Sequence, residues 1–247
     1  MMEINDEVSS TVNYALEAAE RGRVQSAMDT LTSLWRDHPL HYGVAFGIGA
    51  IYALKGEHET AIAWFDRAIA IFPDNIESHY NKAVAYQKLL DVPNCIRSYQ
   101  KVVAIGPAND TEVDKAKSIL RDMAATVRKN YGIDLDAFLK AGDSFNEAFE
   151  LMEREDWAGA LAGFQTAASL NDRNAPCHGN MGLCFAYLGH KREALASLGR
   201  ALEIDADYQP AFSNRKLVEK MTEGAPLENV TFQSINHSLE KFLGVRD

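Results

Sequence analysis

Residues 49–73 read GAIYALKGEHETAIAWFDRAIAIFP, and this stretch decides the fold. The small residues Gly49 and Ala61 lie on either side of a Lys-Gly turn at 55–56, and apolar residues recur three and four positions apart after the turn. The run ends at Pro73, which cannot continue a helix. The pattern therefore predicts two antiparallel helices joined by a tight turn.

The same pattern recurs along the chain with a period of 34 residues. Pro39, Pro73 and Pro107 are spaced by 34, and the same shift aligns the small and the large apolar positions before each proline. The template fits five segments, which are 8–41, 42–75, 76–109, 141–174 and 175–208. Because a single helical hairpin cannot bury its apolar face alone, we expect the five to stack into an all-α solenoid.

These residues resemble the tetratricopeptide repeat (TPR). The family pattern is matched by Gly49, Tyr52, Gly56, Ala61, Phe65, Ala68 and Pro73. The resemblance covers about 170 of the 247 residues, although the family's early tryptophan is missing from every unit. It implies a TPR-type α-solenoid, a right-handed superhelix of antiparallel helix pairs with a concave groove lined by the first helix of each pair. It also implies a non-catalytic scaffold that binds a peptide or protein segment in that groove, without a cofactor.

Four segments are predicted. They are a three-repeat array at 8–109, a helical joint or cap at 110–140, a two-repeat array with a capping helix at 141–223, and an amphipathic tail helix at 227–247. Within the joint we expect a helix over 110–129 that Thr111 caps, and a second helix that begins near Asp134. The apolar stripe of the tail consists of Phe232, Ile235, Leu239, Phe242 and Leu243.

Composition and charge narrow the classes of partner and compartment. The formal net charge is −10, and such an acidic excess repels a phosphate backbone, so no nucleic-acid partner is expected. The longest apolar stretch, residues 43–54, is too short to span a membrane, and the N-terminus lacks the apolar core of a signal peptide. The three cysteines have no metal-binding spacing. We therefore predict a cytoplasmic protein without a metal site.

One position of the first helix carries asparagine in most units. This position lies two residues before the small residue of the first helix. The asparagines found there are Asn13, Asn81, Asn146, Asn180 and Asn214. An amide side chain both donates and accepts hydrogen bonds, so a row of them could bind the main chain of an extended peptide. We predict peptide binding by Asn81, Asn146, Asn180 and Asn214. The alternative is that asparagine is merely frequent at this repeat position.

Aromatic residues near the same positions are predicted to anchor apolar side chains of the ligand. They are Phe46, Tyr80, Phe145, Phe149 and Tyr187. The alternative interpretation is that several of them pack between neighbouring units. The segment from Ala141 onward has 16 acidic and 10 basic residues, so it is the part expected to favour a basic partner.

No catalytic motif is present in the sequence. Cys177 and His178 are adjacent, but the repeat pattern places no acid to orient them, so we expect no catalytic residues. An alternative to ligand binding is a structural self-association module, in which the C-terminal helix or the groove forms homo-oligomers.

Overall fold

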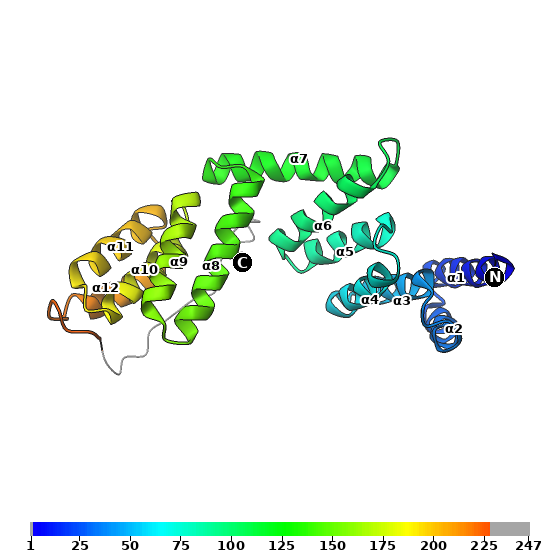
Figure 1. Cartoon of the computed structure of the whole chain (residues 1–247), viewed down its shortest axis with the longest axis horizontal. Helices are drawn as coiled ribbons and strands as arrows, with labels where there is room; N and C mark the ends of the chain where they lie inside the picture. The colour runs from blue at the N-terminus through cyan, green and yellow to red at the C-terminus, as the bar shows by residue number, and fades with distance from the viewer. Residues whose placement is uncertain (1, 228–247) are drawn as a thin grey trace. The chain divides into compact units, whose positions relative to one another are not determined.

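The computed structural model describes residues 2–227, with side chains from residue 7 onward, and its regular structure there consists of helices (Figure 1). Their bounds are α1 (Met2–Glu20), α2 (Val24–Asp37), α3 (Tyr42–Leu54), α4 (His58–Ile71), α5 (Ile76–Lys88), α6 (Val92–Ile105), α7 (Thr111–Tyr131), α8 (Leu135–Glu153), α9 (Trp157–Leu170), α10 (Ala175–Tyr187), α11 (Lys191–Ile204) and α12 (Gln209–Val218). The predicted all-α fold is confirmed. The predicted tail helix at 227–247 lies, apart from Leu227, outside the described residues.

The helices form antiparallel hairpins at the predicted places, and the tight turn within each one has a common geometry. The second residue after the first helix has a positive φ at this turn, which glycine adopts without strain. It is glycine in three hairpins and another residue in two: Gly22, Gly56, Gly189, Leu90 and Glu155. The turn predicted at residues 55–56 is present, and the equivalent turns also form at Leu90 and Glu155, where the glycine is missing.

Each hairpin is closed by a large side chain on its second helix, packed against a small residue on its first helix. The large side chains are fully buried: Leu31, Phe65, Tyr99, Phe164 and Leu198. A Cβ added to Gly49 would lie 2.8 Å from Phe65 Cε1, and one added to Gly182 would lie 2.6 Å from Leu198 Cγ. The two helices of each hairpin are therefore too close for a larger residue at these positions.

The chain divides into two compact units, which we call unit 1 (Met1–Asp122) and unit 2 (Met123–Asp247). The division falls inside α7. In unit 1 an apolar core joins α1, α2 and α3 around residues such as Leu31 and Ile48. In unit 2 one core lies around Phe145 and Phe164, and another around Leu198 and Tyr208.

The start of the first helix and the cap of α7 differ from the prediction. Helix α1 begins at Met2 rather than at residue 8. The predicted cap of α7, Thr111, is wrong: Asp110 Oδ1 accepts from the backbone N–H groups of Glu112 (2.8 Å) and Val113 (3.1 Å). Aspartate performs this role well because its carboxylate also favours the positive end of the helix dipole.

The chain folds back after α12. The backbone N–H of Gly224 donates to the carbonyl of Gly189 (2.9 Å), and that of Leu227 donates to the carbonyl of Ala186 (3.2 Å). These bonds hold residues 224–227 against the end of α10. Of the helices that the structure describes, none is both long and apolar enough to cross a bilayer.

Candidate functional site

The four predicted asparagines occupy equivalent positions on α5, α8, α10 and α12, but their surroundings differ. Asn146 is exposed and Asn81 is half-buried, whereas Asn180 and Asn214 are each only 2% exposed. The side-chain amide of Asn81 donates to the backbone carbonyl of Glu77 within its own helix (2.8 Å). The four amides are therefore not equally available to a ligand.

Asn180 has a buried donor with no partner. Its Nδ2 is inaccessible to solvent, and no hydrogen-bond acceptor lies within reach of it among the described residues. Buried polar groups in proteins are nearly always hydrogen-bonded, and leaving one unpaired costs about 1–3 kcal/mol. On α10, this donor is therefore a buried polar group without a partner.

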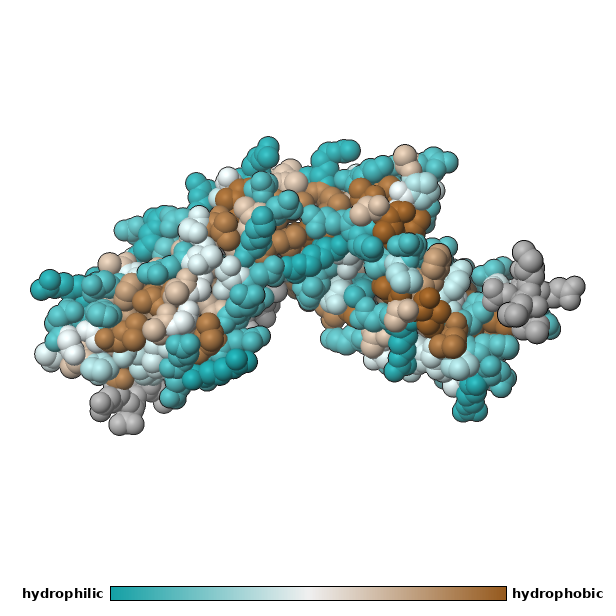
Figure 2. Space-filling model, in the orientation of Figure 1, coloured by the Kyte–Doolittle hydropathy of each residue, from teal (hydrophilic) through white to brown (hydrophobic). Residues whose placement is uncertain are grey.

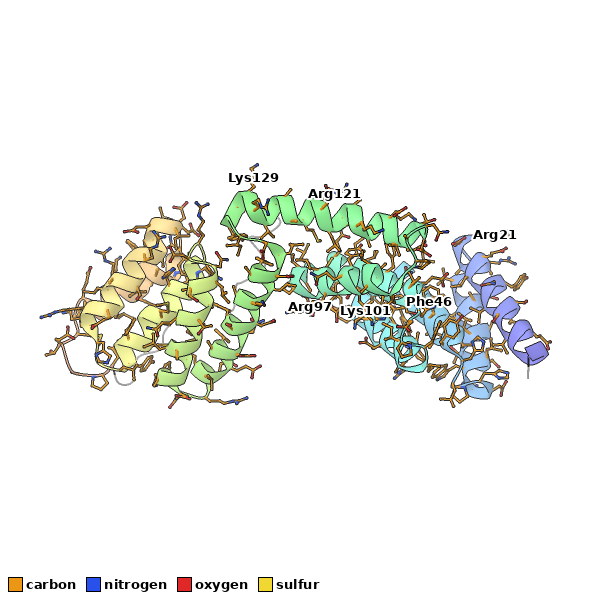
Figure 3. The ribbon with its side chains drawn as sticks, turned by 45° about the horizontal axis from the view of Figure 1, so that its top comes forward. Arg21, Phe46, Arg97, Lys101, Arg121 and Lys129 are labelled. Atoms are coloured by element: carbon orange, nitrogen blue, oxygen red, sulfur yellow. The ribbon has the colours of Figure 1, made fainter. Side chains whose placement is uncertain are left out.

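Three of the predicted aromatic residues belong to a ring pair that recurs within single hairpins. The ring centroids lie 5.8 Å apart for Phe46 and Phe65, 5.6 Å for Tyr80 and Tyr99, and 5.3 Å for Phe145 and Phe164. Such pairs stabilise a fold beyond the area that they bury. Phe46, which Figure 3 labels on α3, and Tyr80 remain partly exposed, whereas Phe145 is fully buried.

The remaining two aromatic residues are also held by neighbours. Phe149 is 8% exposed and lies 6.4 Å from Phe145, in the same apolar cluster. Tyr187 is partly exposed and stacks on Trp157, with centroids 3.8 Å apart and ring planes 6° apart. Phe145 and Phe149 thus have the packing role that the sequence left open, although Phe145 packs within a hairpin rather than between units.

Two histidines make a contact that the sequence pattern did not predict. His79 Nε2 lies 2.9 Å from the carbonyl oxygen of Pro73, and His178 Nε2 lies 3.1 Å from that of Asp172. Both histidines stand where the family carries its early tryptophan, on the third and fifth predicted units. Each ties a first helix to the turn before it, and their equivalent placement was the signal that could have revealed the contact.

Asp172 links this contact to the next helix. Its carboxylate lies 3.1 Å from His178 Nε2 and accepts from Arg200 (2.5 Å). The bond from Arg200 holds the pKa of Asp172 below its usual range. All three groups belong to unit 2, where they join α10 and α11 to the turn before α10.

The environment of Cys177 does not fit a nucleophile. Its thiol donates to the backbone carbonyl of Phe164 (3.1 Å), and burial raises its pKa to about 12. Such a thiol stays protonated at neutral pH, whereas a reactive cysteine needs a lowered pKa. Within residues 2–227, no three His, Cys, Asp or Glu side chains come together to hold a metal ion.

Comparison with protein families identifies the repeat. A model described as TPR repeat matches residues 49–89, and one described as tetratricopeptide repeat matches residues 175–208. The first match, in unit 1, runs from within α3 through α4 and α5, and the second, in unit 2, coincides with the repeat predicted at 175–208. The assignment of the other hairpins as repeats of this family stays a prediction. No curated protein matches the chain.

Several solved TPR structures are similar to the chain. YrrB, described as a TPR protein with an unusual peptide-binding site, is 18% identical over 83% of this chain and 90% of its own, with a TM-score of 0.39. The TPR2AB domain of yeast Sti1, in a complex with pHSP90, is 21% identical over 89% and 84%, with a TM-score of 0.40. MamA from Desulfovibrio magneticus RS-1 is 15% identical over 82% and 97%, with a TM-score of 0.37.

Proposed function

Because this chain is a tetratricopeptide repeat protein, we propose that it is a scaffold that binds a peptide or protein segment along the first helices of its hairpins. The observation that carries this proposal is the buried, unpaired amide of Asn180. When the Asn180 side chain turns toward solvent, a main-chain carbonyl of a bound segment would supply the missing acceptor. The side-chain oxygen of the same amide could accept from a main-chain N–H of that segment.

The placement of the other asparagines supports a main-chain ligand. Asn146 and Asn214 occupy the equivalent positions on the helices before and after α10. A main chain offers a donor and an acceptor at every non-proline residue, so it can meet amides repeated at a constant interval whatever its sequence. Each such bond would stabilise the complex by about 1 kcal/mol.

Apolar anchors would come from aromatic residues that are partly exposed, which are Phe46 and Tyr80 in unit 1 and, as a separate anchor, Tyr187 in unit 2. Phe145 and Phe149 would stabilise the first helix α8 by packing in the apolar core of unit 2. Exposed carboxylates on α8, such as Glu147, Glu150 and Glu153, would favour basic side chains on the partner.

The experiment compares Asn180→Ala with the wild-type chain in binding and in stability. The immobilised proteins are incubated with a cell lysate, and captured partners are quantified by mass spectrometry. We expect Asn180→Ala to lose partners retained by the wild type, with an unfolding free energy that is unchanged or raised by up to about 1 kcal/mol, because the substitution removes an unpaired donor.

Two further variants make the test specific. Asn146→Ala changes an exposed residue and should weaken capture without affecting folding, whereas Gln165→Ala, on the second helix α9, should leave capture unchanged. Equal capture by the wild type and by the Asn146→Ala/Asn180→Ala double variant would contradict the proposal. So would a large loss of stability in Asn180→Ala, which would show a structural role for the amide.

A further inference from the structure

The turns between successive hairpins of unit 1 form a continuous surface, separate from the proposed groove. Each turn joins the end of a second helix to the start of the next first helix, so stacked hairpins bring these turns to the same edge. We call this surface the turn edge, and it consists of residues 38–42, 72–77 and 106–112. The rings of Tyr42 and Phe72, 5.1 Å apart, join the first two turns. Ile76 Cδ1, 3.2 Å from where a Cβ of Gly106 would lie, joins the second to the third.

The first part of the turn edge is apolar and exposed. Leu40 is 83% exposed, Phe72 43% and Tyr42 38%. His41 extends this surface, because its ring stacks on that of Tyr42 with centroids 5.7 Å apart. Figure 2 shows hydrophobic residues gathered over the part of the molecule that holds α3 and α4. Contiguous exposed apolar residues of this kind are typical of a binding surface.

Leu40 is the most informative of these residues. The equivalent positions of the other predicted repeats hold Asp74, Ala108, Arg173 and Asp207. A leucine is not required for the turn, since the other turns form without one. Its exposure leaves the side chain available for a contact with another molecule.

The far part of the turn edge is acidic. The pKa of Glu77 is raised by burial and by the nearby carboxylates of Glu112 and Asp110. No described residue makes a hydrogen bond or ion pair with the Glu77 carboxylate. The cation nearest to Glu112 is Lys115, with Nζ 3.9 Å from Oε1, and this ammonium also lies 6.0 Å from the ring centre of Tyr80. Asp110 is occupied as the cap of α7. Glu112 thus has one ammonium beside it, and the Glu77 carboxylate has no ion-pair partner among the described residues.

We propose that the turn edge binds a basic, amphipathic segment of a partner protein. Apolar side chains of that segment pack on Leu40, Tyr42 and Phe72, and its lysine or arginine side chains pair with Glu77, Asp110 and Glu112. The charge complementarity selects the partner: a cation would relieve the repulsion among the carboxylates, whereas an acidic segment would add to it. The apolar residues Leu40, Tyr42 and Phe72 alone would not discriminate between a basic and an acidic segment.

The geometry also sets the spacing of the partner's side chains. The starts of α3 and α7 are separated by at least two helix widths. Because a helix is about 10 Å wide, this distance is about 20 Å. An extended segment needs roughly six residues to cover this distance, at about 3.3 Å per residue. The apolar and basic groups of the partner should therefore be separated by about six extended residues.

The test uses synthetic peptides and the full chain. A fluorescein-labelled peptide of about 12 residues carries Leu-Leu-Phe, a Gly/Ser spacer of about six residues and Lys-Arg-Lys. A second peptide has the reverse order, and an acidic twin carries Glu-Asp-Glu in place of the basic group. Binding is measured by fluorescence anisotropy at low and high salt. We expect one of the two basic peptides to bind, with weaker binding at high salt, and the acidic twin to bind at least about tenfold more weakly.

Variants assign the binding to the turn edge. Leu40→Asp should weaken binding at least about tenfold without unfolding the chain, because Leu40 is almost fully exposed, whereas Leu54→Asp, an exposed apolar residue at the other end of α3, should bind as the wild type does. Glu77→Gln/Glu112→Gln should weaken binding and reduce its salt dependence, and Glu59→Gln is the control. Asn180→Ala should bind the peptide normally, so this surface and the groove are tested independently.

Three results would overturn the inference. The first is equal binding of the basic peptides and the acidic twin. The second is unchanged binding by Leu40→Asp. The third is a wild-type dimer in light scattering that Leu40→Asp converts to a monomer, because a second copy of the chain would then be what covers the apolar end.

Discussion

At the scale of single residues, the tight turn within each hairpin shows the cost of a side chain in the left-handed region. Glu155 has φ 60°, at the place where Gly56 has φ 80° and Gly189 has φ 84°. A residue with a Cβ costs about 1–2 kcal/mol in this conformation. We expect Glu155→Gly to raise the unfolding free energy by about 0.5–1 kcal/mol, after part of that gain is offset by the greater entropy of glycine in the unfolded chain.

The reverse substitution is the control. No atom lies within 4 Å of a Cβ added to Gly56, so Gly56→Glu changes only the backbone preference and should destabilise the hairpin by a similar amount. Thermal unfolding should shift by about 2–4 °C per kcal/mol, upward for Glu155→Gly and downward for Gly56→Glu. Shifts in the same direction would show that the left-handed backbone is not what limits stability here.

His79 makes the stability of unit 1 depend on pH. Its pKa is lowered from 6.5 by burial first, and then by Lys101 and Lys82, against the opposing effects of its bond to the Pro73 carbonyl and of Asp66. The unfolded chain therefore takes up a proton first as the pH falls through about 6.5, and the unfolding free energy falls until the pH passes the folded pKa. Stability from this group is present above 6.5 and lost below it.

The measurement is chemical denaturation at several pH values between about 7.5 and 5. Wild type should lose more stability across this range than His79→Gln, whose amide can still donate to the Pro73 carbonyl but does not titrate. Parallel curves for the two proteins would show that other groups, such as His41, cause the dependence.

At the scale of helices, caps explain where several second helices begin. Asp156 Oδ1 accepts from the backbone N–H of Gly159 (2.9 Å), and Asp91 Oδ1 does the same for Asn94 (3.2 Å). Glu57 occupies the equivalent place before α4 with similar backbone angles, but its side chain makes no capping bond. We expect Asp156→Ala to destabilise the chain by about 1 kcal/mol and Glu57→Asp to stabilise it by a similar amount, as measured by urea unfolding.

Asp156→Asn is the matched control for the cap. Asparagine can supply the same side-chain oxygen without the charge, so it should retain most of the stability that alanine loses. A loss as large as that of Asp156→Ala would indicate that the negative charge near the start of α9, rather than the hydrogen bond, provides the stabilisation.

The ends of the second helices could be predicted because a following proline and the packing of the hairpin favour the same last residue. Helices α2, α4 and α6 end at Asp37, Ile71 and Ile105, each two residues before a proline of the 34-residue series. A proline disfavours the helical conformation of the residue before it. Helices α9 and α11 end at the equivalent residues although Asp172 and Ala206 replace the proline. Packing of the hairpin therefore sets these ends, and the proline reinforces them.

The candidate site was less predictable than the fold, because adjacent residues on a helix point about 100° apart. Phe145 and Asn146 are neighbours in sequence, yet Phe145 is fully buried against Phe164 and Asn146 is exposed. The period of 34 identifies equivalent positions, but it does not say which of them face the partner helix. The burial of Asn180 depends on its neighbours in three dimensions, which no spacing encodes.

At the scale of the whole molecule, the repeated packing predicts how far the destabilisation caused by a core substitution extends along the chain. Phe65 in unit 1 and Phe164 in unit 2 occupy the same position of their hairpins, both are fully buried, and each packs on an aromatic ring of the first helix. Replacing either with alanine removes a core ring and should cost about 3–5 kcal/mol. In a repeat array stability is a sum of local terms and contacts between neighbours, so the cost should stay near the substitution.

Hydrogen exchange followed by mass spectrometry distinguishes local from global loss of stability. We expect Phe65→Ala to reduce the protection of α3–α6 and to leave α9–α11 close to wild type, and Phe164→Ala to show the opposite pattern. If either variant lowered protection equally throughout the described helices, the two units would unfold together as one cooperative block. Separate unfolding would mean instead that the amide of Asn180 in unit 2 and the turn edge of unit 1 can each be disabled without unfolding the other unit. The binding tests of these two surfaces could then be interpreted independently.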